Sequence, residues 1–266
     1  MNQPLRMVCP AVAVFALAAL IASNGHVAVA QGRIGQLANE SSPGLAALAS
    51  AAQQGRYSFV FFWKENDAQT QQMHRVFQSG TARMADAADA LNVSVTDPRE
   101  QPMVEKFGVD RAPMPLVLAV APNGAVTKAW PAQFSEQQLQ EGIVSLGTAQ
   151  CMKALQDNKI VLLCIQNAQT AYSNAAWQVA QEFKADPRFT TATETIALDP
   201  ADPREAALLH DLEVSSATPE AVTVVLAPPG RPIARFVGVV SKDEIVAKFT
   251  AAQSECCPGG QCGPKH

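Results

Sequence analysis

The residues best suited to chemistry lie near the end of the chain. Three thiols stand within Cys256-Cys257-Pro258-Gly259-Gly260-Gln261-Cys262, and His266 follows. Thiolates and imidazoles are ligands that Cu(I) or Zn(II) accept, although this spacing is not the paired C-x-x-C of a structural zinc site. The same cysteines are also suited to a disulfide, within or between chains, or to thiol exchange. The sequence leaves these three uses open.

Two further cysteines lie in segments that should be folded. Cys151 falls in a predicted helix and Cys164 in a predicted buried strand, and the two elements are expected to pack together. One prediction is therefore a structural disulfide, worth about 2–4 kcal/mol. The alternative is two separate thiols that are buried as small hydrophobic side chains.

A strand-to-helix junction is the other place where chemistry could lie. The apolar run Phe59–Trp63 predicts a buried strand, and Met73, Val76 and Phe77 follow at helical spacing. The four positions at the junction are Asp67-Ala68-Gln69-Thr70. A helix start favours an anion, and an aspartate there suits helix capping. None of the four carries sulfur, so the junction predicts a capped helix rather than a nucleophile.

The N-terminus has the features of an export signal. Arg6 precedes an apolar run over residues 12–22, and Ala28-Val29-Ala30 fits the small-x-small cleavage rule. We predict a cleaved signal peptide over residues 1–30, a periplasmic or extracellular protein, and no membrane span after cleavage. An uncleaved anchor is the alternative, but a span needs about 20 apolar residues. Cleavage would remove Cys9 from the six cysteines, and the odd number left requires one thiol to stay free, pair between chains or bind metal.

Length and composition predict folded domains. A chain of 266 residues, 48% of them hydrophobic and 17% charged, is long enough for two packed cores. The formal charge of −4 and the absence of a Lys/Arg cluster argue against a nucleic-acid surface.

The spacing of apolar residues gives the same order of elements twice. After a lead-in over residues 31–41, residues 42–147 read as helix, strand, helix, strand, helix, strand hairpin and helix, and residues 148–253 repeat that order. The second helix is expected to reach Ala90, ahead of a strand over residues 93–96. Parallel strands joined by crossover helices, with an antiparallel hairpin, predict two tandem α/β domains with mixed sheets and helices on both faces. Residues 254–266 are predicted to be a flexible Cys/Gly/Pro tail.

Matching letters support an internal duplication. Asp97-Pro98-Arg99-Glu100 is repeated as Asp202-Pro203-Arg204-Glu205. Three matches occur in the same order in both halves, and the other two pair residues 66–70 with 167–170 and residues 121–124 with 227–230. They indicate a duplication with a boundary near Gly147.

The first half resembles domains of the thioredoxin-like superfamily. Phe62-Trp63-Lys64-Glu65 is similar to that family's strand before the active site, Lys106-Phe107-Gly108-Val109 to its approach to a cis-proline, and Asn123-Gly124 to its hairpin turn. The resemblance covers residues 42–147 and, more weakly, 148–252. Together with the predicted signal peptide, the resemblance suggests an exported bacterial-type protein with two tandem domains of this fold that lack the C-x-x-C motif.

The resemblance implies where the functional residues would stand. In that family a C-x-x-C begins the helix, and both thiols are needed for exchange. Here the corresponding window is Trp63 with Asp67, Ala68, Gln69 and Thr70, and residues 168–171 in the second half carry no cysteine either. The cis-proline is Pro113 or Pro115, with Met114–Pro115 favoured. In the second half the expected cis bond is Thr218–Pro219.

These observations give three hypotheses for function. The first is a non-catalytic, exported protein that binds protein or peptide partners or serves as a scaffold. The second is a thiol- or soft-metal-handling protein that uses the tail, with Cu or Zn as the one cofactor implied. The third is residual thiol–disulfide exchange. His74 is interpreted as a solvated helix residue, and the sequence does not indicate the oligomeric state.

Overall fold

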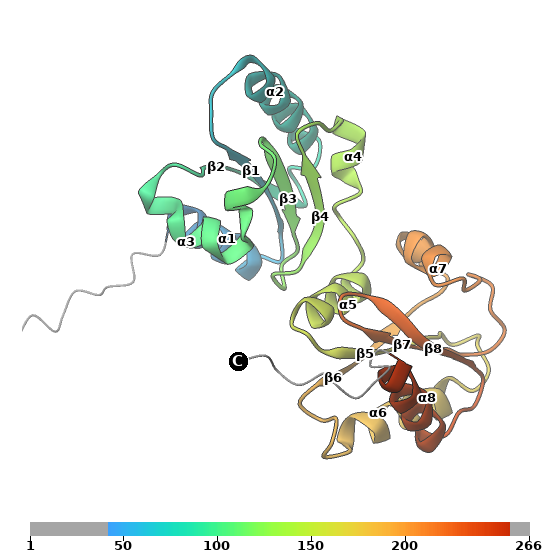
Figure 1. Ribbon diagram of the computed structural model, residues 1–266. Coiled ribbons are helices and arrows are strands. Elements are labelled where there is room, and N and C mark those ends of the chain that lie inside the picture. The colour runs from blue at the N-terminus through green and yellow to red at the C-terminus, as the bar shows by residue number, and fades with distance from the viewer. Residues whose placement is uncertain (1–41, 256–266) are drawn as a thin grey trace, which may run out of the picture. The chain divides into compact units, whose positions relative to one another are not determined.

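The computed structural model describes residues 42–255, and the first half of that range forms a four-stranded sheet. In the strand order β2-β1-β3-β4, β1 (Tyr57–Trp63) pairs in parallel with β2 (Ala88–Ser94) and antiparallel with β3 (Leu116–Val120), which pairs antiparallel with β4 (Val126–Pro131). Figure 1 shows the helices around this sheet. They are α1 (Pro43–Gln53), α2 (Ala68–Ala82), α3 (Gln101–Phe107) and α4 (Glu136–Gln140), with 3₁₀ turns η1 (Pro98–Glu100) and η2 (Val109–Arg111).

The second half forms a sheet with the same topology. In the order β6-β5-β7-β8, β5 (Ile160–Ile165) pairs in parallel with β6 (Thr193–Leu198) and antiparallel with β7 (Val222–Ala227), and β8 (Arg231–Val237) pairs antiparallel with β7. Its helices are α5 (Leu146–Gln156), α6 (Ser173–Ala185), α7 (Ala206–Asp211) and α8 (Lys242–Glu255), with the 3₁₀ turn η3 (Pro203–Glu205). The predicted fold class is confirmed, because two mixed α/β sheets of this kind define two thioredoxin-like domains.

The central strand of each sheet is buried on both faces. Successive side chains of a strand point to opposite faces, so Phe59 and Phe61 of β1 pack with α2 and α4, whereas Val60 and Phe62 pack with α1 and α3. The side chains of β5 also alternate: those on one face pack against α5 and α7, and those on the other face pack against α6 and α8. This burial explains why both strands read as continuous apolar runs.

The second helix and the second strand have different bounds from those predicted. Helix α2 ends at Ala82 instead of Ala90, and β2 begins at Ala88, before the predicted range 93–96. The Arg56 guanidinium donates to three backbone carbonyls of the connecting turn, those of Ala85, Asp86 and Ala88. These carbonyls therefore have hydrogen-bond partners without being part of a helix. The spacing of apolar residues cannot predict this contact, because Arg56 lies far from the turn in sequence.

Both halves begin their first helix with a serine cap. Ser42 Oγ accepts a hydrogen bond from the Leu45 N–H at 3.0 Å at the start of α1. Ser145 Oγ accepts one from the Thr148 N–H at 2.9 Å at the start of α5. A cap of this kind satisfies one of the amide groups that a helix start leaves without a partner.

A buried glutamate from each Asp-Pro-Arg-Glu segment supports the same helix start. The Gly44 N–H donates to both oxygens of Glu100, at 3.1 and 3.2 Å, and the Thr148 hydroxyl donates to Glu205 Oε2 at 2.6 Å. Glu100 is 7% exposed and Glu205 is 2% exposed. Gly44 and Gly147 stand at the same helical position, where a Cβ would lie 2.2 Å from a neighbouring side chain. The shared arrangement favours the internal duplication that the sequence indicates.

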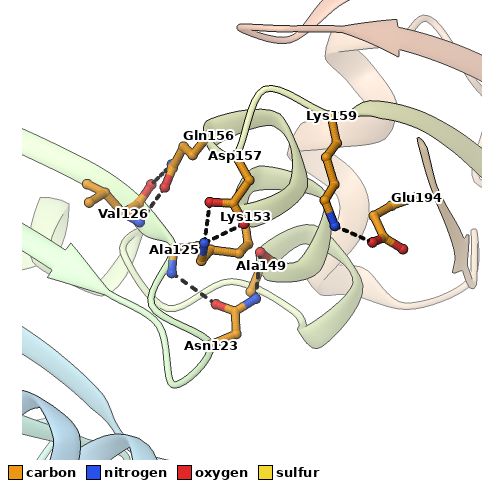
Figure 2. Close-up of polar contacts among 9 residues, drawn as sticks. All are labelled: Asn123, Ala125, Val126, Ala149, Lys153, Gln156, Asp157, Lys159 and Glu194. Carbon is orange, nitrogen blue, oxygen red and sulfur yellow. Dashed lines mark hydrogen bonds and ion pairs between the residues drawn. The ribbon is translucent and has the colours of Figure 1, made fainter. Parts of the chain in front are cut away.

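Helix α5 is also hydrogen-bonded to the turn and start of the β3–β4 hairpin. The Asn123 amide donates to the Ala149 carbonyl at 2.9 Å, and its oxygen accepts from the Ala125 N–H at 3.1 Å. The Gln156 amide pairs with the backbone of Val126 through two further bonds (Figure 2). The Asn-Gly turn therefore contacts a helix as well as connecting two strands.

Several predictions about the ends of the chain fall outside the described residues. They concern the signal peptide over residues 1–30, the lead-in over residues 31–41 and residues 256–266 of the predicted tail. The tail prediction began two residues too early, because Ser254 and Glu255 belong to α8. The domain bounds near Gly147 stay a prediction, and that residue lies in the first turn of α5. Within residues 42–255, no helix is both long enough and apolar enough to cross a membrane.

Candidate functional site

Asp67 caps α2 at the end of the β1 segment. Its Oδ1 accepts a hydrogen bond from the Thr70 N–H at 2.7 Å, and Thr70 itself is buried. This backbone bond, with the Thr70 hydroxyl as a second donor, holds the pKa of the Asp67 carboxyl below its usual range. Gln69 reaches from the same window to the Ala132 carbonyl, 3.3 Å away. The helix start therefore holds a carboxylate that accepts hydrogen bonds from the first turn of α2.

Replacing Asp67 by alanine is expected to destabilise the protein in a pH-dependent way. Because the pKa of Asp67 is lower in the folded protein, the carboxylate stabilises the fold above the usual carboxyl pKa, near 4. That contribution is lost as the pH falls through the lower folded value. Urea unfolding of both proteins from pH 7 to pH 2.5 should show a difference that is constant at high pH and shrinks below about 4. A difference that stays constant over the whole range would contradict the capping role of the charge.

The corresponding window of the second half is built differently, although its letters match. The Asn167 N–H donates to Thr170 Oγ1 at 3.0 Å, and the Asn167 oxygen accepts from the Gln169 N–H at 2.9 Å. Helix α6 begins only at Ser173, after Tyr172, whose φ of 64° is left-handed and whose side chain makes no cap. A polar turn thus takes the place of the helix start that Asp67 caps in the first half.

The proline loop lies just before β3. The Met114–Pro115 bond is cis, and the Pro115 carbonyl accepts a hydrogen bond from the Ala132 N–H at 2.7 Å. Pro113 precedes it in the same loop. This places one edge of the loop beside Ala132, the residue that Gln69 also contacts.

The expected cis bond at Thr218–Pro219 is wrong. Strand pairing matches Leu116 with Pro131 and Val222 with Val237, so the counterpart of Pro115 is Ala221, which accepts from the Gly238 N–H at 2.8 Å. The second cis bond among the described residues is Pro228–Pro229, in the β7–β8 turn. The sequence prediction placed the loop two residues too early, because Pro219 aligns with Pro113.

Cys151 and Cys164 are free and buried, so the predicted disulfide is wrong and the alternative of two separate thiols holds. Cys151 packs in the cluster with Val161, Leu163 and Ile165, whereas Cys164 packs with Leu162 on the opposite face of β5. A sheet therefore separates the two sulfur atoms, and no side-chain rotation brings them together. Burial raises the pKa of each thiol to about 12, with the charge of Glu205 adding to the effect at Cys151.

Alkylation of the native protein at pH 8 is expected to spare both buried thiols. Only the thiolate reacts quickly, and a pKa of about 12 leaves almost none of it at that pH. Mass mapping after iodoacetamide treatment should find Cys151 and Cys164 unmodified, and both modified once urea is added. Rapid labelling of either residue in the folded protein would contradict the packing described.

A hollow of about 540 Å³ lies beside the window and was not singled out by the sequence. Phe61 and Trp63 of β1, Asn92 of β2, and His74 and Arg75 of α2 contribute to its lining. His74 is half-buried, its ring centroid lies 5.2 Å from that of Phe61, and its Nε2 donates to Asn92 Oδ1 at 2.8 Å. The interpretation of His74 as a solvated residue therefore holds only in part, because one side of its ring packs on Phe61. Asn92 pairs with Phe61 across β1 and β2, a register that single-sequence periodicity does not supply.

The predicted metal ligands Cys256, Cys257, Cys262 and His266 lie outside the described residues. The described part thus contributes the capped window, the proline loop and the hollow. Together they define a class: a protein with two thioredoxin-like domains, the first of which carries Asp67 and Thr70 at the start of α2.

The sequence matches no protein-family model and no curated protein. Solved structures that resemble it include thioredoxin O2 from Arabidopsis thaliana in its oxidized state, 13% identical with a TM-score of 0.31 over 38% of this chain and 84% of that one. A disulphide isomerase from Xylella fastidiosa is 16% identical, with a TM-score of 0.31 over 40% and 88%. Human ERp44 form II is 12% identical, with a TM-score of 0.33 over 79% and 56%. At these TM-scores the matches carry neither a ligand nor an activity to this chain.

Proposed function

We propose that this chain is an exported, non-catalytic thioredoxin-like protein that binds protein partners or serves as a scaffold. The observation that carries the proposal is Asp67, which caps α2 through Thr70 at the position where the fold would hold a reactive thiol. Disulfide exchange needs an attacking and a resolving sulfur. Neither window has one, and the two cysteines among residues 42–255 are buried with raised pKa values.

Reduction of insulin by the full mature chain tests this proposal. We expect no turnover with dithiothreitol as the electron source beyond the rate of the reductant alone. The variant with Cys256, Cys257 and Cys262 all changed to serine serves as the control and should behave in the same way. A wild-type rate that this variant loses would move the function to the tail and overturn the proposal.

Export is part of the same proposal and has its own measurement. We expect the mature protein recovered from the periplasm or the medium to begin at Gln31, after the small-residue site ending at Ala30. Intact-mass analysis of the fractionated protein measures this directly. A full-length mass in the membrane fraction would favour the uncleaved anchor instead.

The second candidate function is thiol or soft-metal handling by the tail. The close spacing of Cys256, Cys257 and Cys262 ahead of His266 favours it. Protein purified under reducing conditions, with and without residues 254–266, should then differ in bound copper or zinc. Equal metal content in both forms would remove this candidate.

A further inference from the structure

The hollow beside the Asp67 window is lined in part by aromatic side chains. Phe61 is almost completely buried, and the His74 ring meets it edge-on, with an interplanar angle of 60°. Trp63, half-buried at the end of β1, belongs to the same lining. Aromatic surfaces of this kind pack best against another flat apolar group. A volume of about 540 Å³ is enough for a ligand the size of an aromatic amino acid or a short peptide end.

The charge of the lining has one sign. Arg75 is the one formally charged side chain among the residues that line the hollow, and no carboxylate lines it. Within residues 42–255, Arg75 is exposed and stands in none of the ion pairs. Two acids flank the lining residue Asn66 in sequence: Asp67 is already bonded to the Thr70 N–H, and Glu65 is exposed and does not line the hollow. A guanidinium in this situation is free to pair with a carboxylate through two parallel hydrogen bonds.

Neutral groups around the hollow add donors. The oxygen of Asn92 accepts from His74 Nε2, which leaves the NH₂ group of the Asn92 amide available to donate. Gln71 and Asn66 also line the hollow, and the Gln71 amide donates to the Asn66 carbonyl at 3.3 Å. Donors of this kind complement an oxygen-rich group and fix its orientation.

We propose that this hollow binds a carboxylate attached to a flat apolar group, with Arg75 pairing with the carboxylate and the half-buried Trp63 receiving the ring. The carboxylate belongs either to a small aromatic acid or to the C-terminal aromatic residue of a polypeptide. The proposal goes beyond the non-catalytic role, because it names a ligand class and a site that β1, β2 and α2 line and to which the Pro115 loop contributes no residue.

Calorimetric titration of the full mature chain tests the ligand class. The probes are N-acetylphenylalanine, N-acetylphenylalanine amide and acetate. We expect saturable binding of the acid, at least about tenfold weaker binding of the amide, and none of acetate, because a charge-assisted bond and ring contact are both required. Equal affinity for the acid and the amide, or no saturable binding of the acid, would overturn the proposal.

Variants at the hollow test the residues. Arg75→Gln keeps a polar, hydrogen-bonding side chain but removes its charge, and should weaken binding of the acid by about tenfold or more while leaving binding of the amide unchanged. Arg111→Gln is the matched control, because Arg111 is an exposed cation of the same half that does not line the hollow. Thermal unfolding confirms that each variant is folded. Unchanged binding in Arg75→Gln, or an equal loss in Arg111→Gln, would reject the assignment.

A peptide arm distinguishes the two sources of the carboxylate. Titration with Gly-Gly-Gly-Phe and with its C-terminal amide is compared with the N-acetylphenylalanine result. Tighter binding of the tetrapeptide acid assigns the site to polypeptide ends, whereas equal or weaker binding assigns it to small acids. The insulin assay is independent of these titrations, so failure of either proposal can be recognised separately.

Discussion

Changing Asp67 and Thr70 together to cysteine is expected to create disulfide exchange at α2. The two residues are the N-cap and the third helical position, and the Asp67 carboxylate already lies 2.7 Å from the Thr70 N–H. A thiol at position 67 would face the same amide groups and helix dipole that lower the pKa of Asp67. A second thiol at the buried position 70 would act as the resolving group.

The measurement is insulin reduction in a background in which Cys256, Cys257 and Cys262 are serine. We expect the Asp67→Cys/Thr70→Cys protein to exceed its background by about tenfold or more, and each single substitution to stay at background. Mass analysis should find the new pair as a disulfide after mild oxidation. A double variant that forms no disulfide would show that the window lacks the geometry that exchange requires.

Glu205→Ala is expected to destabilise the protein by about 3 kcal/mol, since a buried hydrogen-bonding carboxylate is removed. Glu205 is 2% exposed and accepts from the Thr148 hydroxyl at 2.6 Å, so the substitution leaves that hydroxyl without its acceptor at the start of α5. It also leaves space beside Gly147, which lies close to Glu205 Oε1. Urea unfolding followed by circular dichroism measures the change.

Glu182→Ala supplies the matched control. Glu182 is an exposed acid of α6 that accepts one bond from Gln178, and its loss should change the free energy of unfolding by less than about 0.5 kcal/mol. Thr148→Val combined with Glu205→Ala should cost less than the two changes separately, because the partners lost are the same. If the two changes in the free energy of unfolding simply add, the Glu205 carboxylate does not stabilise the fold through its hydrogen bond with Thr148.

The sequence predicts the fold because its strongest signals are local. The continuous apolar runs at Phe59–Trp63 and Ile160–Ile165 come from strands buried on both faces. Two of the three sets of repeated letters, Asp-Pro-Arg-Glu and the hairpin turn, occur at equivalent places in the two halves. Asp67 is recognisable as a cap because capping involves residues three apart in sequence. Each of these features is contained within a few neighbouring residues.

The features that the sequence does not give depend on contacts between distant segments. The hollow requires the pairing of Phe61 with Asn92, and the end of α2 requires the reach of Arg56 to a later turn. Cys151 and Cys164 lie on opposite faces of the second sheet, which helix and strand assignments alone do not decide. The cis bond before β7 was predicted at Pro219 because the sequence shows a proline there. The register of β7 with β8 shows that Ala221 is the residue equivalent to Pro115.

The buried glutamates also bear on how the chain matures. The Gly44–Glu100 and Thr148–Glu205 contacts join positions 56 and 57 residues apart. During synthesis the first helix of each half leaves the ribosome well before the carboxylate that completes its start. The start of each first helix can therefore make this contact only after its Asp-Pro-Arg-Glu turn has emerged, and fragments truncated ahead of Glu100 or Glu205 should be more readily cleaved by proteases at that helix start.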